Sequence, residues 1–363
     1  MGNRIRVLWV LGNLSTGGVE TWLKSIYIDL LVHDIELHIL LTNPLNKGEM
    51  FHSFQSIGIP IYHLPYTVRK IITFTFYFKR LLRKWDFNIV HEHGDFAGCL
   101  KFILQPGLKN KLFIHIHSSI RGVEEYYFRK RLINRLLWKI SYTWFKNSRK
   151  ILGTSSSALK EFNLLDRYNA DTLYCSVREE FVIKKYLPKE VDLLFIGRLD
   201  EYLDFNAPNN HKNSWFALNV MAKCLEINEN LKCVFIGGPQ KRLDELRIQK
   251  LPLIEKISFQ SNILNPVDIF AQSRIVIFPS AHEGFGLVAV EAQLQGCFVL
   301  ASDKVSVETK ISDNIQYLPL NDLSLWSQKV IDLLQKTPSF DVNRSKFSPS
   351  QSSMNLKIAY ESF

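Results

Sequence analysis

The sequence predicts an α/β protein built from two successive parallel sheets. Short apolar runs recur at helix-sized intervals along the chain, as they do in βα units that form a parallel sheet. The pattern restarts after a polar stretch, Arg178–Glu190, which is expected to link two domains. The halves also differ in charge, because residues 1–190 contain 28 Lys and Arg against 16 Asp and Glu, whereas the remaining residues contain 17 and 19. Two domains with different partners are the simplest interpretation.

Several apolar runs have the length of strands. In the first half these runs are Ile5–Leu11, Glu36–Leu41, Pro60–Leu64, Asn88–His91, Leu112–His115 and Lys150–Gly153. In the second half they are Val191–Ile196, Lys232–Ile236, Arg274–Phe278 and Phe298–Ala301. Helical spacing of apolar residues predicts helices at Glu20–Leu31 and at Gln351–Phe363. The same spacing near the end of the chain also alternates, so periodicity alone does not exclude a strand there.

Composition excludes several classes of protein. The chain has 363 residues, of which 46% are hydrophobic and 22% charged, so it is neither disordered nor collagen-like. Its five cysteines are odd in number and form no C-x-x-C pair, which argues against a disulfide framework and a zinc cage. No apolar run approaches the ~18 residues of a membrane-spanning helix, and Val7–Leu11 is too short for a signal-peptide core. A cytoplasmic location is therefore expected.

The stretch Pro279–Ala292 carries the strongest chemical signal. It follows the apolar run Ile275–Phe278 and leads into a helical segment, which is where ligands gather in open α/β sheets. Its glycines would let backbone N–H groups approach a ligand, and the helix N-terminus favours anionic or oxygen-rich groups. Glu283 and Glu291 are expected about two helical turns apart, where they could accept hydroxyl donors from one ligand. A capping loop with a solvated glutamate is the structural alternative.

Two further motifs also follow predicted strands. In Phe195–Leu199 a predicted strand ends in Gly197-Arg198, and His211-Lys212-Asn213 follows later. The forked guanidinium of an arginine and the point charge of a lysine suit a diphosphate. Solvated basic residues are the alternative there. The turn Leu11–Glu20 contains glycines but matches neither G-x-G-x-x-G nor the P-loop, which argues against ordinary dinucleotide or NTP binding. Phosphate contact at this helix N-terminus and a plain turn both stay open.

Two pairs of histidines stand at strand ends, His91 with His93 and His115 with His117. Alternation along a strand places the two members of each pair on the same face. No D-x-D, H-E-x-x-H or cysteine cluster accompanies them. A hydrogen-bonding or proton-handling role is therefore favoured over a structural metal, and satisfied core histidines are the third interpretation.

Together these motifs resemble one family. Glu283-Gly284-Phe285-Gly286 with Glu291 reproduces the E-x7-E signature of the retaining glycosyltransferases of family 4. Other landmarks occur in the family's order, at Gly17–Glu20, Val90–His93, Gly197–Leu199 and Pro279-Ser280. The chain resembles the family over nearly its whole length, above all its bacterial capsule and exopolysaccharide members. The resemblance implies a GT-B fold, with two Rossmann-like domains whose parallel sheets face each other across a cleft, and an activity that requires no metal or other cofactor.

The resemblance also implies domain limits and site residues. Residues 1–185 would form the acceptor-side domain and residues 186–348 the donor domain, while residues 349–363 would form a helix packed back on the first domain. The implied catalytic residues are His117, Arg198, Lys212 and Glu283. The implied substrate-binding residues are Gly17, Gly18, His93, Gly284, Phe285, Gly286, Leu287 and Glu291.

The resemblance implies a role for most of these residues. Arg198 and Lys212 would hold the donor diphosphate, and Glu291 would accept the ribose hydroxyls. Glu283 and the amides of residues 284–287 would hold the transferred sugar, while the glycines at 17 and 18 would approach the phosphates from the first domain. His117 matches a histidine that contacts the sugar near the reacting carbon. The family usually places its lysine soon after Gly-Arg, whereas residues 200–211 intervene here, which weakens the assignment of Lys212.

The implied function is transfer of a hexose from a nucleotide diphosphate sugar, expected to be a UDP-sugar, to a lipid-linked or growing saccharide. A nucleotide-sugar epimerase or hydrolase of the same fold is one alternative. A non-catalytic polyanion-binding protein is another, although the chain has no recognisable motif for binding nucleic acid, and no nucleic-acid partner is expected. Transfer and hydrolysis differ in whether nucleotide release depends on an added acceptor.

Two basic segments suggest a place for the protein at a membrane. Arg69–Lys84 and Tyr126–Lys139 mix basic residues with aromatic and aliphatic ones, a composition typical of helices that lie on a membrane surface. Because the family's acceptors are typically lipid-linked, the first domain is expected to dock on the anionic inner face of the plasma membrane. The alternative is that the apolar residues face the core while the charges are solvated.

Overall fold

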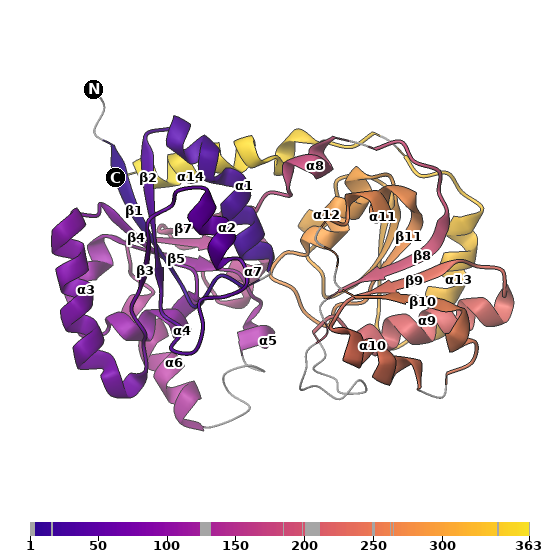
Figure 1. The fold of residues 1–363 in the computed structure, drawn as a ribbon, viewed down its shortest axis with the longest axis horizontal. Helices are drawn as coiled ribbons and strands as arrows, with labels where there is room; N and C mark the ends of the chain where they lie inside the picture. Colours follow the sequence, from indigo (N-terminus) through magenta and orange to yellow (C-terminus); the bar gives the residue numbers. More distant parts are fainter. Residues whose placement is uncertain are drawn as a thin grey trace. The chain divides into compact units, whose positions relative to one another are not determined.

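The computed structural model describes residues 4–15, 17–123, 132–183, 185–197, 199, 211–248, 251–261, 263, 265–339 and 341–362. The chain forms two compact units (Figure 1). The first unit comprises Met1–Arg178 and Lys346–Phe363, and the second comprises Glu179–Ser345. The boundaries between the units therefore fall after residues 178 and 345, whereas the resemblance implied boundaries after residues 185 and 348.

The first unit contains a parallel sheet of seven strands in the order β3-β2-β1-β4-β5-β6-β7. Its strands are β1 (Ile5–Leu11), β2 (Ile35–Leu41), β3 (Ile61–His63), β4 (Ile89–Glu92), β5 (Leu112–Ile116), β6 (Lys150–Gly153) and β7 (Ala170–Thr172). Its helices are α1 (Gly18–Val32), α2 (Phe51–Ser56), α3 (Ile71–Trp85), α4 (Asp95–Cys99), α5 (Ile120–Val123), α6 (Leu132–Phe145), α7 (Ser156–Glu161) and α14 (Pro349–Glu361).

The second unit contains a parallel sheet of six strands in the order β10-β9-β8-β11-β12-β13. Its strands are β8 (Val191–Ile196), β9 (Cys233–Ile236), β10 (Ile257–Gln260), β11 (Ser273–Phe278), β12 (Phe298–Ser302) and β13 (Ile315–Leu318). Its helices are α8 (Glu179–Val182), α9 (Ser214–Ile227), α10 (Gln240–Arg247), α11 (Val267–Gln272), α12 (Leu287–Leu294) and α13 (Leu323–Leu334). Across both units, short 3₁₀ helices lie at Val68–Lys70, Leu100–Phe102, Pro106–Asn110, Ile254–Lys256, Val307–Thr309 and Ser345–Phe347.

Both sheets are covered by helices on two sides (Figure 1), which explains why their central strands are continuous apolar runs rather than alternating ones. In β1 the five residues from Val7 to Leu11 are buried, and in β12 the whole strand is buried. Each unit has its own apolar core. The prediction of two parallel-sheet α/β domains is confirmed.

The predicted strands are all present, with ends shifted by at most a few residues. Three strands were missed, β7, β10 and β13, each at an edge region of its sheet and each only three or four residues long. Their sequences mix polar and apolar residues, so they lack the apolar run that marks a central strand. The end of the chain is a helix, α14, whose N-cap Ser348 accepts a hydrogen bond from the backbone N–H of Gln351. The helical interpretation of this segment is confirmed.

The strand order reverses once in each sheet. In the first unit the reversal lies between β1 and β4, and in the second between β8 and β11. Ligands of open α/β sheets bind beyond the carboxyl ends of the strands at such a reversal. The loops that follow these four strands contain most of the residues singled out from the sequence.

Candidate active site

The loops after β8 and β11 meet in the second unit through a charged pair. The Lys212 amine donates a hydrogen bond to Oε1 of Glu283 over 2.6 Å. Both side chains are largely buried, at 19% and 10% exposed. Burial by itself would raise the pKa of the Glu283 carboxyl, but Lys212 and His211 together lower it below its usual range. Glu283 is therefore a carboxylate, able to accept hydrogen bonds from hydroxyl groups.

The conformation of the loop between β11 and α12 requires glycine at position 286. Gly286 is the N-cap of α12 and has a φ of 106°, in the left-handed region. A Cβ atom there would lie 3.1 Å from both Phe278 and Val305, so a side chain would be strained and crowded. Leu287 is the first residue of α12 and Glu291 lies in its second turn, whereas Glu283 precedes the helix. The expectation of two carboxylates two helical turns apart is therefore wrong, because only one of them is helical.

Glycines also bring the end of β8 close to Lys212. A Cβ atom on Gly197 would lie 3.3 Å from Cβ and Cγ of Lys212, and one on Gly237 would lie 1.8 Å from the carbonyl oxygen of Gly197. At position 237 only glycine allows this approach, because a Cβ atom would collide with the backbone, and at position 197 a side chain would be crowded by Phe195 and Lys212. Lys212 is therefore held at the end of β8 despite the long insertion before it. Arg198 lies outside the described residues.

Two histidines of this site were missed in the sequence. His211 Nε2 lies 3.5 Å from Oε1 of Glu283, and His211 Nδ1 lies 3.2 Å from Nδ1 of His282. The backbone N–H of Ala281 donates to the carbonyl of His211, which ties the two loops together. Each histidine directly precedes a residue that was singled out, Lys212 or Glu283, and that adjacency was the available signal.

The glycine turn of the first unit leads directly into α1. Gly17 is the N-cap and Gly18 the first helical residue. A Cβ atom on Gly17 would lie 2.6 Å from Oε2 of Glu20, so an acidic group of the helix itself lies beside this N-terminus. An anion that approached here would meet that carboxylate. The phosphate-facing role of the two glycines stays a prediction.

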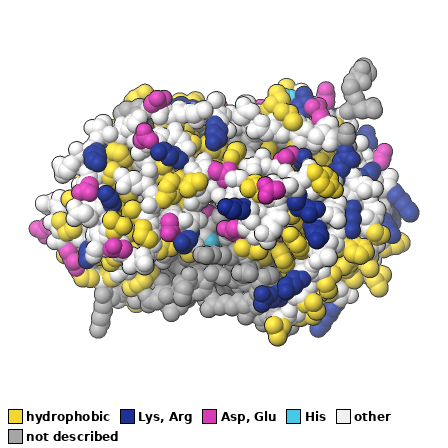
Figure 2. All heavy atoms as spheres, turned by 180° about the vertical axis from the view of Figure 1, so that it is seen from behind, with side chains coloured by type: hydrophobic (Ala, Val, Ile, Leu, Met, Phe, Trp, Pro, Cys, Tyr) yellow, Lys and Arg dark blue, Asp and Glu magenta, His cyan; other side chains and the backbone are white. Residues whose placement is uncertain are grey.

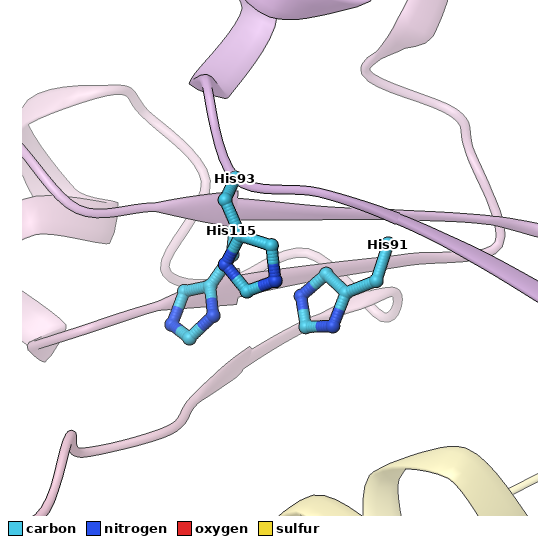
Figure 3. A group of neighbouring side chains, drawn as sticks. All are labelled: His91, His93 and His115. Atoms are coloured by element: carbon cyan, nitrogen blue, oxygen red, sulfur yellow. The ribbon is translucent and has the colours of Figure 1, made fainter. Parts of the chain in front are cut away.

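The four histidines form one cluster, because β4 and β5 are neighbours in the sheet. The ring centroids of His91 and His93 lie 4.2 Å apart, and those of His115 and His117 lie 3.9 Å apart. Between the strands, His93 Nδ1 lies 3.0 Å from Nε2 of His117. Figure 3 shows His91, His93 and His115 on the same side of the sheet. The expectation that each pair shares a face is confirmed.

Burial keeps these rings neutral. Loss of solvation lowers the pKa of His117 to about 3 and lowers the pKa values of His91, His93 and His115 well below the usual range. His117, the most exposed of the four, can therefore offer hydrogen bonds near neutral pH but no positive charge.

The terminal helix α14 packs on α1 and reaches the histidine cluster. Trp9 Nε1–H donates to the Tyr360 hydroxyl over 2.8 Å, and the same hydroxyl lies 2.7 Å from Nδ1 of His91. Trp22 Nε1–H donates to Ser352 Oγ, also over 2.8 Å. The last helix of the chain is thus attached to the first unit by hydrogen bonds between buried polar side chains.

Comparison with known proteins decides the family. Residues 16–175 match the family model described as Glycosyltransferase Family 4, and residues 178–337 match the model described as Glycosyl transferases group 1. The chain belongs to the family 4 glycosyltransferases. The two matched ranges follow the two compact units of this glycosyltransferase closely.

A relative in sequence agrees with this assignment, and solved structures agree with the fold. The family 4 enzyme is 24% identical over 371 residues to the capsular polysaccharide biosynthesis glycosyltransferase CapH of Staphylococcus aureus, with 99% of each chain covered. Its structure resembles HepE from Anabaena in complex with UDP and glucose, with a TM-score of 0.72, 14% identity and coverage of 99% and 100% of the two chains. A glycosyltransferase from Rickettsia africae gives a TM-score of 0.69 at 15% identity, covering 99% of this chain and 93% of that one. The GT-B fold and the resemblance to capsule enzymes are confirmed.

None of the described helices combines the length and the apolar character needed to cross a bilayer. All five cysteines are buried and none forms a disulfide.

Proposed function

We propose that this glycosyltransferase moves a hexose from a UDP-sugar to a lipid-linked or growing saccharide during surface polysaccharide synthesis, with retention of anomeric configuration. The observation that carries the proposal is the contact between Lys212 and Glu283 at the strand-order reversal of the second unit. That unit is the one matched to the group 1 model. CapH is named for capsular polysaccharide biosynthesis, and HepE is known in complex with UDP-glucose, which supports the substrate class.

The chemistry of transfer requires two kinds of contact that this site offers. As the bond between the anomeric carbon and the diphosphate breaks, negative charge grows on the leaving group, and the Lys212 ammonium stabilises that charge. Lys212 has three N–H donors, so it can bind a phosphate oxygen while it still donates to Glu283. Glu283 stays ionised beside it and accepts hydrogen bonds from the hydroxyls of the transferred sugar.

Other residues complete the proposed donor site. Glu291, in α12, would accept the ribose hydroxyls, and the N-terminal amides of that helix would face the sugar. His117 would contact the sugar as a neutral hydrogen-bonding group, because burial lowers its pKa to about 3. The diphosphate charge would be met by Lys212 and Arg198, so that the reaction needs no metal.

A membrane surface fits the exposed face of α3. This face presents the basic residues Lys79, Arg80, Arg83 and Lys84. Beside them Ile72, Phe76 and Tyr77 are 76%, 65% and 49% exposed. Figure 2 shows Lys, Arg and hydrophobic side chains gathered on the first unit. The basic residues would attract an anionic leaflet and the apolar ones would insert into it, which would bring a lipid-linked acceptor to the enzyme. The second basic segment falls partly outside the described residues, and its described part is the exposed, apolar-rich start of α6.

Donor binding tests the proposal directly. The thermal unfolding midpoint of the enzyme should be measured with a panel of nucleotide sugars, since a ligand at 100 times its Kd adds about 2.7 kcal/mol to the stability. A UDP-sugar should raise the midpoint most, and its effect should shrink in Lys212→Ala. If no nucleotide sugar raised the midpoint, the donor class would be wrong.

A further inference from the structure

We propose that the buried histidine cluster of the first unit binds a divalent transition-metal ion such as Zn²⁺, through His91, His93 and His115. This site lies in the first unit, and a bound ion there goes beyond the proposed transfer reaction. One ring nitrogen from each of these three residues lies within 4.8 Å of the nitrogens offered by the other two. Figure 3 shows the three rings side by side beneath the sheet.

The first argument is that these nitrogens lack partners. His91, His93 and His115 are 0%, 8% and 0% exposed. Nε2 of His91, Nε2 of His93 and both ring nitrogens of His115 have no partner within hydrogen-bond geometry, although the Leu173 backbone interacts with the His115 ring. A buried polar atom without a partner costs about 1–3 kcal/mol, so four such atoms in one place call for a bound species. A single cation would satisfy three of them at once.

The second argument is that the opposite nitrogens of two of these rings do have partners. His91 Nδ1 lies 2.7 Å from the Tyr360 hydroxyl, and His93 Nδ1 lies 3.0 Å from Nε2 of His117. A histidine that ligates a metal through one nitrogen generally donates its other N–H to a neighbouring acceptor, which fixes the ring and the tautomer. In the tautomer in which Nδ1–H is the donor of each contact, the Nε2 lone pairs of His91 and His93 are left for a metal.

The chemistry of the site indicates which ions it would accept. Three neutral imidazoles suit Zn²⁺ and its Co²⁺, Ni²⁺ and Cu²⁺ neighbours, whereas Mg²⁺ and Ca²⁺ require oxygen ligands. Zn–N distances are about 2.0–2.1 Å, so binding would draw the three nitrogens closer together by rotation of the rings. A water molecule would take the fourth position. The ion would link β4, β5 and, through Tyr360, the terminal helix α14.

A second set of ligands overlaps this one and has to be distinguished from it. His115, His117 and Cys175 also bring possible ligand atoms within 4.8 Å of one another. In that set His117 Nε2 is already engaged with His93, and its Nδ1 lies 3.9 Å from the Cys175 sulfur. His91 belongs only to the proposed site, and Cys175 belongs only to the alternative.

The test is a titration of the 363-residue chain, without a histidine tag and after removal of metals, with Zn²⁺ in one experiment and with Co²⁺ in another. We expect one tightly bound ion, a rise in the thermal unfolding midpoint, and Co²⁺ absorption typical of four-coordination without a thiolate band. His91→Leu should lower the affinity at least tenfold, and Tyr360→Phe should lower it less, because it removes only the group that orients His91. Cys175→Ser and the surface control His52→Gln should bind as the wild type does.

Three results would overturn the proposal. The wild type could bind no ion, which would mean that water satisfies the four nitrogens. His91→Leu could bind Zn²⁺ as tightly as the wild type, which would place the ion elsewhere. Co²⁺ could show a thiolate band that Cys175→Ser removes, which would assign the ion to the overlapping set. If His91→Leu failed to fold, the Co²⁺ spectrum of the wild type with the Cys175→Ser control would still decide between the two sets.

Discussion

The Lys212 ammonium lies 2.6 Å from the Glu283 carboxylate and joins the loops that follow two neighbouring strands of the second sheet. The contact brings together a cation suited to a diphosphate and an anion suited to sugar hydroxyls. Lys212, together with His211, lowers the pKa of the Glu283 carboxyl and keeps it charged in a largely buried place. A substitution at either residue therefore affects both.

Loss of the lysine should impair turnover more than donor binding. A charge contact that strengthens as the leaving group departs acts mainly in the transition state. Lys212→Ala is expected to lower kcat about 100- to 1,000-fold, the usual effect of removing one such group. Steady-state kinetics measures it, with Lys329→Ala on α13 as the control. A normal kcat in Lys212→Ala would show that another residue holds the diphosphate.

The second carboxylate should govern donor affinity. Glu291→Gln keeps the size of the side chain but weakens its acceptance of hydrogen bonds from the ribose. Hydrogen bonds to charged groups contribute about 1.5–3 kcal/mol, so the KM for the donor should rise about tenfold or more. Glu226→Gln, at an exposed position of α9, is the matched control. An unchanged donor KM would exclude Glu291 from the ribose site.

A buried acid in the first unit should make stability depend on pH. Burial, the largest effect, raises the pKa of Asp95 from 3.8 to about 7, with Glu92 adding to the rise while the Ala97 N–H and Lys101 oppose it. Between these two pH values the folded protein holds a proton that the unfolded chain has released. The free energy of unfolding should therefore fall as the pH rises from about 4 to about 7.

Replacement of this acid by its amide should remove that part of the pH dependence. Asp95→Asn should match the wild type near pH 4 and be more stable above pH 7, by up to about 4 kcal/mol at about 1.4 kcal/mol per pKa unit. Urea unfolding at several pH values measures the difference. Parallel curves for the two proteins across this range would show that Asp95 ionises normally in the folded state.

Membrane binding should depend on the charges of α3. Replacement of Lys79, Arg80, Arg83 and Lys84 with Gln should weaken sedimentation with anionic vesicles, since each basic residue near such a surface contributes about 1 kcal/mol. The donor affinity should not change. Replacement of four exposed lysines of the second unit, Lys241, Lys256, Lys310 and Lys336, is the control. Equal binding of the wild type to neutral and anionic vesicles would rule out the electrostatic mechanism.

Transfer should persist without metals. Because Lys212 and Arg198 are proposed to meet the diphosphate charge, EDTA should leave the transfer rate within about twofold, even though it would strip an ion from the histidine cluster. Activity that EDTA abolishes and that Mn²⁺ or Mg²⁺ restores would require a metal-bridged diphosphate instead.

The central strands were predictable because they are buried on both faces and so read as uninterrupted apolar runs, as Val7–Leu11 does. The edge strands β7, β10 and β13 were not, because such short strands mix polar and apolar residues. The histidine pairs were predictable from alternation along each strand. Their merging into one cluster was not, because it depends on which strands are neighbours, and neither was the Tyr360 hydroxyl, which comes from the far end of the chain.

The most direct test of the proposed function is a transfer assay with the purified enzyme, a UDP-sugar and a lipid-linked saccharide acceptor. We predict that UDP release depends on the acceptor, that the sugar appears on the acceptor with its anomeric configuration retained, and that Lys212→Ala and Glu283→Gln both lose this activity. UDP release at the same rate without acceptor, and with no glycosylated product, would contradict transfer and would indicate a hydrolase or epimerase of the same fold.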